Sequence, residues 1–265
     1  MNLLFDTHCH LNLPYFQDDL DDVIQRAIFN NVSYLLVPGI DLDSSIRAIK
    51  LCAMYPSLIY SAIGIHPNIG SINVNTIIDK LKSLAINPCV VAIGEIGLDY
   101  CRKITPVETQ KQLLGKQLEL ALINNKPVII HNREADDDLL NIMIDWYNTI
   151  PSNSQIKNRP GVFHSFSASL NFGKQIIDKG FFIGIGGKIT FKSADNYRKL
   201  ISQFPIKKIV LETDSPYLTP HPYRGKSNEP SYLIHIANVL AEIYHLKFDD
   251  VVNITTKNAK YLFDL

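Results

Sequence analysis

Two histidines near the start of the sequence are spaced as ligands of a divalent metal ion. Residues 5–10 (FDTHCH) follow a short apolar start and read as the end of a first β-strand. Alternate side chains of a strand share a face, so His8 and His10 point the same way. Two neutral imidazoles that converge in this manner can bind a divalent cation. A bare His-x-His also occurs by chance, so the prediction depends on further ligands elsewhere in the chain.

Eight apolar runs rich in β-branched residues predict strands. They cover residues 3–8, 34–38, 59–65, 90–95, 127–131, 161–164, 181–185 and 208–214. Runs that are apolar on both faces suit a buried parallel sheet. Stretches with helical spacing lie between them. One is the stripe within 20–28, and another opens at a capping box over 105–108 and continues to about residue 124.

Strands that alternate with helices at roughly 30-residue intervals predict an α/β fold, a single (β/α)8 TIM barrel. Two closing helices are expected over 232–246 and 249–262, and one domain over residues 1–265. A doubly wound open sheet is the main rival. It would rarely place potential ligands on so many strand ends.

The composition of the chain limits how it could bind a partner and indicates its compartment. Hydrophobic residues make up 46% of the 265, and 26 basic residues balance 26 acidic ones. A protein that holds long duplexes electrostatically would usually carry a basic excess, so attraction to a nucleic acid must be local. The four cysteines show no Cys-x-x-Cys spacing, which indicates reduced thiols. With no apparent signal peptide or membrane-spanning run, we expect a cytoplasmic protein, and a monomer.

Polar residues follow five of the predicted strands, at the barrel end where active sites lie. They are His8 and His10, Glu95 within the run 94–99, His131, His164, and Asp214 within the run 212–216. A single catalytic zinc is satisfied by about three protein ligands and water. Six candidates, one of them a carboxylate able to bridge, instead suit two cations about 3.5–4 Å apart. Such a pair suits hydrolysis at phosphorus.

Several motifs together resemble the TatD family. They are Asp6-x-His8-x-His10, the run 94–99 (GEIGLD), His131-x-Arg133, His164-x-Phe166-Ser167, the run 212–218 (ETDSPYL) and the segment 224–230 (RGKSNEP). They occur in the family's order and span nearly the whole chain. The resemblance implies a TIM barrel of the metal-dependent hydrolase superfamily. It also implies a metal-dependent deoxyribonuclease, often a 3′-exonuclease.

The resemblance implies roles for the candidate ligands. His8, His10, Glu95 and Asp214 would hold one cation. Glu95, His131 and His164 would hold the other, so that Glu95 bridges the pair. Asp214 is also the candidate that orients or deprotonates the attacking water, whose pKa the metals lower. The cofactor is then two divalent cations, with zinc, manganese and magnesium all compatible.

Two further carboxylates are expected beneath the ligands. Strand parity places Glu212 on the face of Asp214, one layer deeper, and Asp6 likewise beneath His8. A buried carboxylate there would accept the free ring N–H of a ligand histidine and fix its tautomer. The alternative is a buried salt bridge within the barrel.

Four residues are candidates for substrate binding. His66, at the end of the third strand, could donate to a phosphate oxygen or cap the turn before Pro67. Arg133 could bind a phosphate through its two-pronged guanidinium, or pair with Asp99 or Glu134. Arg224 and Asn228, together with Lys226, lie on the loop after the last strand. That loop could contact a backbone phosphate or be simply solvated.

The leading hypothesis is a two-metal phosphodiesterase whose partner is DNA, in the form of single strands or frayed 3′ ends. A second reading is a hydrolase of another ester or amide, such as a phosphotriester or lactone, because superfamily barrels share metals and differ in loops. A third is a non-catalytic binding or quality-control factor that retains metal ligands. The segment 224–230 favours nucleic acid, and ligands for both cations favour an enzyme.

Overall fold

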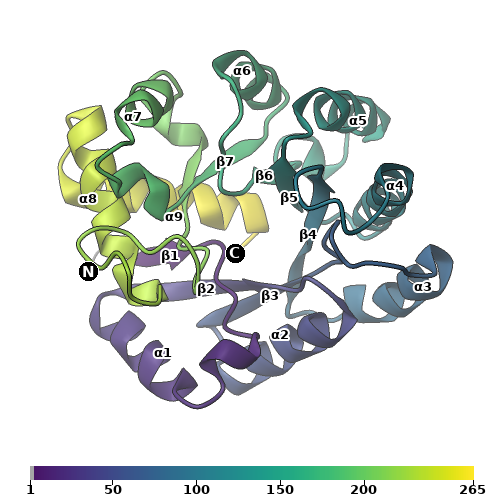
Figure 1. Cartoon of the computed structure of the whole chain (residues 1–265), viewed down its shortest axis with the longest axis horizontal. Helices are drawn as coiled ribbons and strands as arrows, with labels where there is room; N and C mark the ends of the chain where they lie inside the picture. Colours follow the sequence, from purple (N-terminus) through teal and green to yellow (C-terminus); the bar gives the residue numbers. More distant parts are fainter. Residues whose placement is uncertain (1–2) are drawn as a thin grey trace.

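Eight short strands pair in sequence order into one parallel sheet (Figure 1). The computed structural model describes residues 3–265. The strands are β1 (Leu4–Asp6), β2 (Val32–Pro38), β3 (Ile59–Ile63), β4 (Val90–Asp99), β5 (Val128–Arg133), β6 (Gly161–Phe163), β7 (Phe182–Ile185) and β8 (Ile209–Leu211). Most of their residues are buried, as both faces of a parallel sheet between a core and a helical layer must be.

Backbone hydrogen bonds close the sheet into a barrel. The Thr7 amide donates to the Leu211 carbonyl at 3.0 Å, and the Asp214 amide donates to the His8 carbonyl at 2.8 Å. The His10 amide donates to the Ser215 carbonyl at 2.8 Å. The first and last strands are therefore joined through the very segments that carry predicted ligands. The (β/α)8 barrel is confirmed, and the open doubly wound sheet is wrong.

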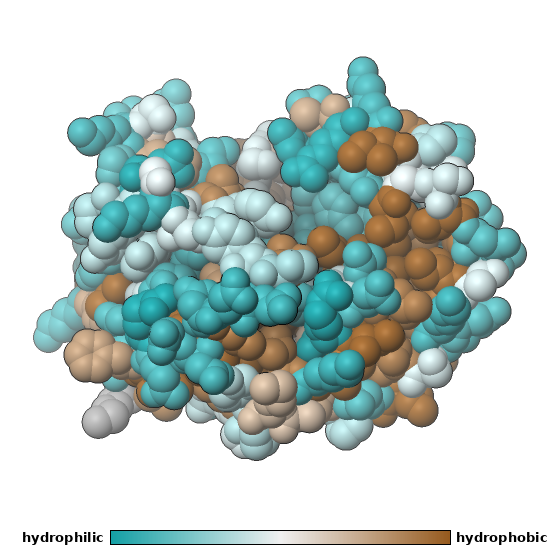
Figure 2. All heavy atoms as spheres, turned by 60° about the horizontal axis from the view of Figure 1, so that its bottom comes forward, coloured by the Kyte–Doolittle hydropathy of each residue, from teal (hydrophilic) through white to brown (hydrophobic). Residues whose placement is uncertain are grey.

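Nine α-helices surround the strands in the described part of the chain (Figure 1). They are α1 (Leu20–Phe29), α2 (Leu42–Met54), α3 (Val74–Ala85), α4 (Val107–Ile123), α5 (Asp136–Thr149), α6 (Leu170–Asp178), α7 (Asp195–Ile201), α8 (Leu233–Tyr244) and α9 (Phe248–Phe263). Figure 2 shows hydrophilic and hydrophobic side chains interspersed on one face of the molecule. Among the described residues no helix combines the length and the apolar character that crossing a bilayer requires.

Two local expectations differ from the structure. Ile28 belongs to the predicted apolar stripe but is 44% exposed, whereas Ala27 in the same turn is buried, so Ile28 lies at the edge of the buried face of α1. The capping box over 105–108 does not form, although α4 begins at Val107 as expected. The Thr105 hydroxyl instead accepts the Gly70 amide at 2.9 Å, so a tertiary contact replaces the local one.

Aromatic side chains and α9 close the end of the barrel opposite the ligands. The ring of Phe5 lies 5.4 Å from that of Tyr34 and 6.0 Å from that of Phe263. Lys260 on α9 donates to the Tyr34 hydroxyl at 2.7 Å. Because this end is filled by packed side chains, the chemistry is confined to the carboxyl ends of the strands.

Gly97 allows β4 and β5 to approach closely beside the predicted ligand His131. Its φ is +149°, and a β-carbon at this position would overlap the His131 carbonyl oxygen. We expect Gly97→Ala to destabilise the protein by about 2–3 kcal/mol, through overpacking and backbone strain. Urea unfolding followed by circular dichroism measures the change.

Gly115→Ala is the matched control for Gly97→Ala. Gly115 lies within α4, and its added β-carbon would meet no atom within 4 Å. Alanine there should stabilise the protein by about 0.5–1 kcal/mol, since it favours the helix. Equal midpoints of urea unfolding for the two variants would contradict the close approach of β4 and β5 at Gly97.

Candidate metal centre

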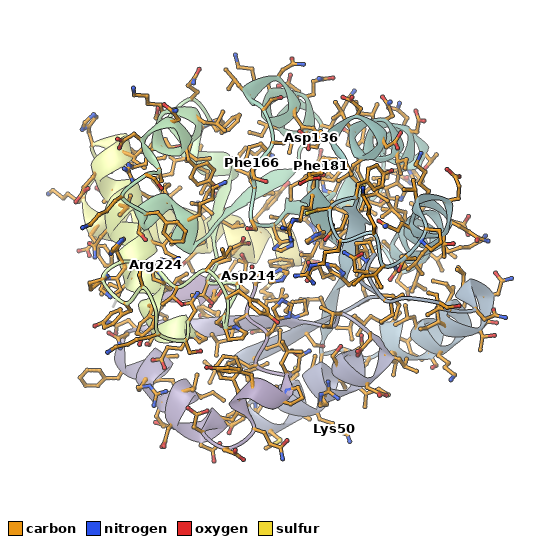
Figure 3. All side chains as sticks on the ribbon, in the orientation of Figure 1. Lys50, Asp136, Phe166, Phe181, Asp214 and Arg224 are labelled. Carbon is orange, nitrogen blue, oxygen red and sulfur yellow. The ribbon has the colours of Figure 1, made fainter. Side chains whose placement is uncertain are left out.

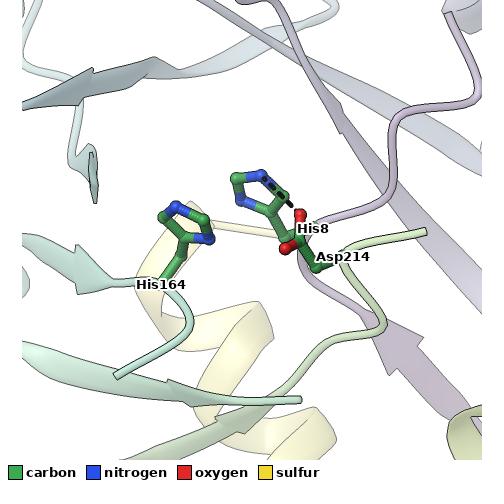
Figure 4. Close-up of side chains that lie close together, drawn as sticks. All are labelled: His8, His164 and Asp214. Carbon is green, nitrogen blue, oxygen red and sulfur yellow. Dashed lines mark ion pairs between the residues drawn. The ribbon is translucent and has the colours of Figure 1, made fainter. Parts of the chain in front are cut away.

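Six predicted ligands converge at the carboxyl end of the barrel. His8 and His10 follow β1, Glu95 lies in β4, His131 in β5, His164 follows β6 and Asp214 follows β8. Figure 4 shows His8, His164 and Asp214 projecting toward one another from three separate segments. The rings of His8 and His164 stack with centroids 4.0 Å apart. The barrel therefore brings together residues that are up to 206 positions apart in the sequence.

The two oxygens of Glu95 face two different groups of imidazole nitrogens. Oε1 lies 2.9 Å from His131 Nδ1 and 2.9 Å from His164 Nε2. Oε2 lies 3.4 Å from His8 Nε2 and 3.6 Å from His10 Nε2. Each carboxylate oxygen thus completes its own cluster of possible ligand atoms. This is the arrangement that a bridging carboxylate requires.

Asp214 joins the cluster of His8 and His10. Its Oδ1 lies 3.5 Å from His10 Nε2 and 3.9 Å from His8 Nε2. The residue adopts a left-handed conformation with φ +56°, which aspartate tolerates better than most residues. Figure 3 shows Asp214 near the middle of the ring of elements. The turned backbone directs the carboxylate inward after β8 has ended at Leu211.

The spacing of these atoms fits divalent cations. Two ligand atoms that each lie about 2.1 Å from a shared ion are themselves about 3–3.5 Å apart. The separations around Glu95 run from 2.9 to 3.6 Å. His8 Nε2 and His10 Nε2 also face each other at 3.1 Å. Two imidazoles and a carboxylate around one point form a donor set suited to zinc or manganese.

Burial and neighbouring charges set the protonation of the ligands. Burial and the adjacent His164 together lower the pKa of His8 to about 4. His8 is therefore neutral, as a metal ligand must be. Burial opposes ionisation of Glu95, but His164 and His131 hold its pKa well below the usual range. Burial likewise opposes ionisation of Asp214, which His10 outweighs, so the pKa of Asp214 is lowered.

Asp6 has a different role from the one expected. Its carboxylate accepts the Thr213 hydroxyl at 2.6 Å and the Thr213 amide at 2.9 Å, as well as the His8 amide at 3.2 Å. It therefore fastens the start of the barrel to the segment after β8, and among the described residues it hydrogen-bonds to no imidazole nitrogen. The expectation failed because the partner on β8 depends on how the barrel closes, which strand parity does not specify.

Glu212 was predicted one layer below Asp214 as the acceptor for a ligand histidine, but in the described structure it makes no hydrogen bond to an imidazole. Its Oε1 is 3.9 Å from His164 Nδ1 and accepts the Ser165 amide. Burial raises the pKa of Glu212 well above its usual range, and the neighbouring Asp214 raises it further. No arginine or lysine pairs with it among the described residues, so the alternative of a buried salt bridge does not hold.

His66 directs one ring nitrogen into the centre. Its Nδ1 accepts the Asn68 amide at 3.1 Å, and its Nε2 lies 3.7 Å from Glu95 Oε1. Since Nδ1 accepts, the neutral ring carries its proton on Nε2, which faces the carboxylate. The turn-capping contact is therefore present, and donation to a phosphate stays a prediction. His66 caps the turn around Pro67 and presents a donor to the site.

The remaining substrate candidates divide into exposed and buried residues. Arg133 is exposed, lines a cavity of about 700 Å³ with Tyr100 and Asn132, and pairs with neither Asp99 nor Glu134 in the described structure.

The candidates on the loop after β8 also differ from one another. Arg224 is exposed farther from the centre (Figure 3), where its guanidinium lies over the Phe191 ring at 4.1 Å. Asn228 is fully buried, and its amide donates to the carbonyls of Thr213 at 2.8 Å and Tyr217 at 2.6 Å. Asn228 therefore holds the loop and cannot contact a substrate. Its burial could not be read from a segment that looks polar throughout.

Sequence reasoning missed Asp99. This residue is 1% exposed at the end of β4, and its Oδ2 lies 3.3 Å from His131 Nε2. Asp99 is four residues from Glu95 on one strand, and this even spacing puts the two on the same face. That parity was the available signal.

Comparisons with known proteins agree with this geometry. The profile of the TatD related DNase family matches residues 5–264. A metal-dependent hydrolase of Bacillus subtilis, YabD, is 38% identical over 98% of this chain and 99% of its own length.

Solved structures agree as well. The crystal structure of YjjV, a TatD homologue from Escherichia coli, superposes with a TM-score of 0.91 at 30% identity, over all of both chains. A TatD family hydrolase from Entamoeba histolytica gives 0.83 at 26% identity, over 98% of each chain.

Cations that bind here should stabilise the fold. We expect a saturating divalent cation, at about 100 times its dissociation constant, to add about 2.7 kcal/mol to the free energy of unfolding. Glu95→Gln should remove most of that gain, because a neutral amide bridges two cations poorly. Thermal unfolding with and without Zn²⁺ or Mn²⁺ measures the difference.

Glu119→Gln is the matched control for the stabilisation experiment. Glu119 lies on the outside of α4, where it pairs only with Lys116 at 3.1 Å among the described residues. This variant should keep the full response to the cation. A Glu95→Gln protein that responds like the control would contradict the bridging role.

Proposed function

This chain belongs to the TatD related DNase family of metal-dependent hydrolases, and on that premise we propose that it is a deoxyribonuclease that hydrolyses phosphodiester bonds at single-stranded or frayed 3′ ends. One observation carries the proposal. The oxygens of Glu95 divide four histidines into two clusters, and Asp214 lies beside one of them. A hydrolase that must stabilise both the attacking and the leaving oxygen at phosphorus uses such a pair of sites.

A bound pair of divalent cations would lower the pKa of water and stabilise negative charge that develops on the phosphate. His8, His10, Glu95 and Asp214 would hold one cation, and Glu95, His131 and His164 the other. All of these residues come from one chain, so the centre needs no second copy. The possible ligand atoms of His8, His10 and Glu95 lie within 4.8 Å of one another, and so do those of Glu95, His131 and His164. Asp214 Oδ1 adds to the first group, 3.5 Å from His10 Nε2.

Asp214 is the group placed to accept a proton. Its neighbours keep the pKa of the carboxyl below the ordinary value, so the oxygens are free to accept. The water oxygen attacks phosphorus as its proton passes to Asp214, the bond from phosphorus to the leaving oxygen breaks, and the leaving oxygen takes a proton from solvent. General base assistance of this kind contributes about 10²- to 10⁴-fold in rate.

His66 and Arg133 supply donors for the phosphate. His66 presents its Nε2 proton at the edge of the centre, 3.7 Å from Glu95 Oε1. Arg133 is exposed at the end of β5, where its guanidinium can bind the next phosphate of a strand. Arg224, on the loop after β8, can bind a backbone phosphate farther from the centre.

Charge and cysteine chemistry support the proposed partner and compartment. The chain has no net charge, which favours capture of a strand end at a compact site over sliding along duplex DNA. All four cysteines are free thiols, as the reducing cytoplasm favours.

Asp214→Asn should lower kcat on a fluorescent single-stranded oligonucleotide by at least about 100-fold, because the amide cannot accept the proton. Asp145→Asn, on the exposed side of α5, makes the same chemical change away from the centre and should leave kcat unchanged. Parallel assays with a paraoxon-like phosphotriester test the alternative hydrolase. Turnover of the triester without cleavage of DNA would contradict the nuclease.

His66→Phe should reduce kcat/KM on the oligonucleotide by about 10- to 100-fold, as expected for loss of a hydrogen bond to a charged group. Because His66 is placed as a donor and not as a ligand, the affinity for Mn²⁺ should not change. His235→Phe, in α8, provides a control with no contact to the centre. A large fall in Mn²⁺ affinity for His66→Phe would mean that this imidazole is itself a ligand.

A further inference from the structure

We infer that Asp99 is a positioning residue, which holds the proton of His131 on Nε2 and thereby leaves Nδ1 free to bind a cation. The inference rests on the proposed metal centre and concerns how one of its ligands is prepared. Asp99 belongs to a third group of potential ligands, with His66 and His131, so the alternative is that these three residues bind a cation of their own. The hydrogen bonds around each residue distinguish the two possibilities.

Two carboxylates, Glu95 and Asp99, compete for the ring proton of His131. Nδ1 lies 2.9 Å from Glu95 Oε1 and 3.2 Å from His164 Nε2, on the side of the proposed cations. Nε2 lies 3.3 Å from Asp99 Oδ2, on the opposite side. A neutral imidazole has one proton to place. If Asp99 accepts that proton from Nε2, the lone pair of Nδ1 points at the centre.

The position of Asp99 is fixed by contacts that involve neither histidine. Its Oδ1 accepts the Cys101 amide at 3.0 Å and the Arg102 amide at 3.1 Å. The side chain of Gln110, from α4, accepts the Asp99 amide at 2.9 Å and donates to the Asp99 carbonyl at 3.0 Å. Oδ1 is therefore occupied by the backbone, and Oδ2 is left for His131.

The same reasoning excludes a cation between His66, Asp99 and His131. His66 Nδ1 accepts the Asn68 amide, so the lone pair of His66 is used there and Nε2 carries a proton. In the proposed tautomer His131 Nε2 likewise donates its proton to Asp99, 3.3 Å away. Neither ring offers a lone pair to an ion at this place, and the group is a hydrogen-bonding network.

Asp99→Asn gives a directional test. The two backbone amides require an oxygen at the Oδ1 position, so the new NH₂ group replaces Oδ2 and faces His131 Nε2. His131 Nε2 must then accept, and the ring proton moves to Nδ1, where it donates to Glu95 and excludes the cation. We expect about 10- to 100-fold weaker binding of Zn²⁺ at the His131 site, as measured by competition with a chelator.

Asp138→Asn is the matched control. Asp138 is a nearby carboxylate that accepts the Tyr100 hydroxyl at 2.6 Å and pairs with Lys111 at 2.8 Å, without contact to His131. Its Zn²⁺ affinity should equal that of the wild type. Either substitution could lower the free energy of unfolding by loosening the loop after β4. Only Asp99→Asn should move the proton of His131 from Nε2 to Nδ1.

Nitrogen-15 NMR of the imidazoles shows directly which ring nitrogen of His131 carries the proton, and the measurement does not depend on nuclease activity. We expect His131 Nε2 to be protonated in the wild type with bound Zn²⁺, and unprotonated in Asp99→Asn. Wild-type protein that binds Zn²⁺ with no proton on Nε2, or with a third ion coordinated there, overturns the role of Asp99 alone. Wild-type protein that binds no Zn²⁺ overturns the proposed metal centre itself.

Discussion

The carboxylate of Glu95 is the point on which the whole arrangement depends. It is buried, it is ionised, and its two oxygens face four ligand imidazoles from three segments of the chain. A buried charge of this kind is costly unless it is paired and hydrogen-bonded. The fold therefore has to deliver several imidazoles to one small volume. The parallel barrel does so because every strand ends at the same rim.

The backbone that delivers these side chains also closes the barrel. His8, His10 and Asp214 lie on the two segments that join β1 to β8, and Asp6 fastens those segments through Thr213. The same two segments therefore close the barrel and position three of the ligands. A change that opened this junction would also separate the ligands. Asp6, which was expected to contact a histidine, stabilises the junction instead through its hydrogen bonds to Thr213.

Much of this could be predicted from sequence, because periodicity and strand ends are local properties. The eight strands, the barrel and the convergence of six ligands follow from apolar runs that end in His, Glu or Asp. What could not be predicted depends on contacts between distant segments. Asn228 looks like a loop residue but is buried against Thr213 and Tyr217, and Thr105 serves Gly70 instead of its own helix. Parity puts Asp99 on the face of Glu95, but the contact of Asp99 with His131 depends on how β4 and β5 pair.

Anomalous scattering from crystals soaked with Zn²⁺ or Mn²⁺ tests the central claim most directly. Data collected on both sides of each absorption edge locate the ions and identify them. The account predicts two ions per chain, one beside each oxygen of Glu95, with His131 coordinated through Nδ1. A single ion, or two ions that do not share Glu95, would contradict it.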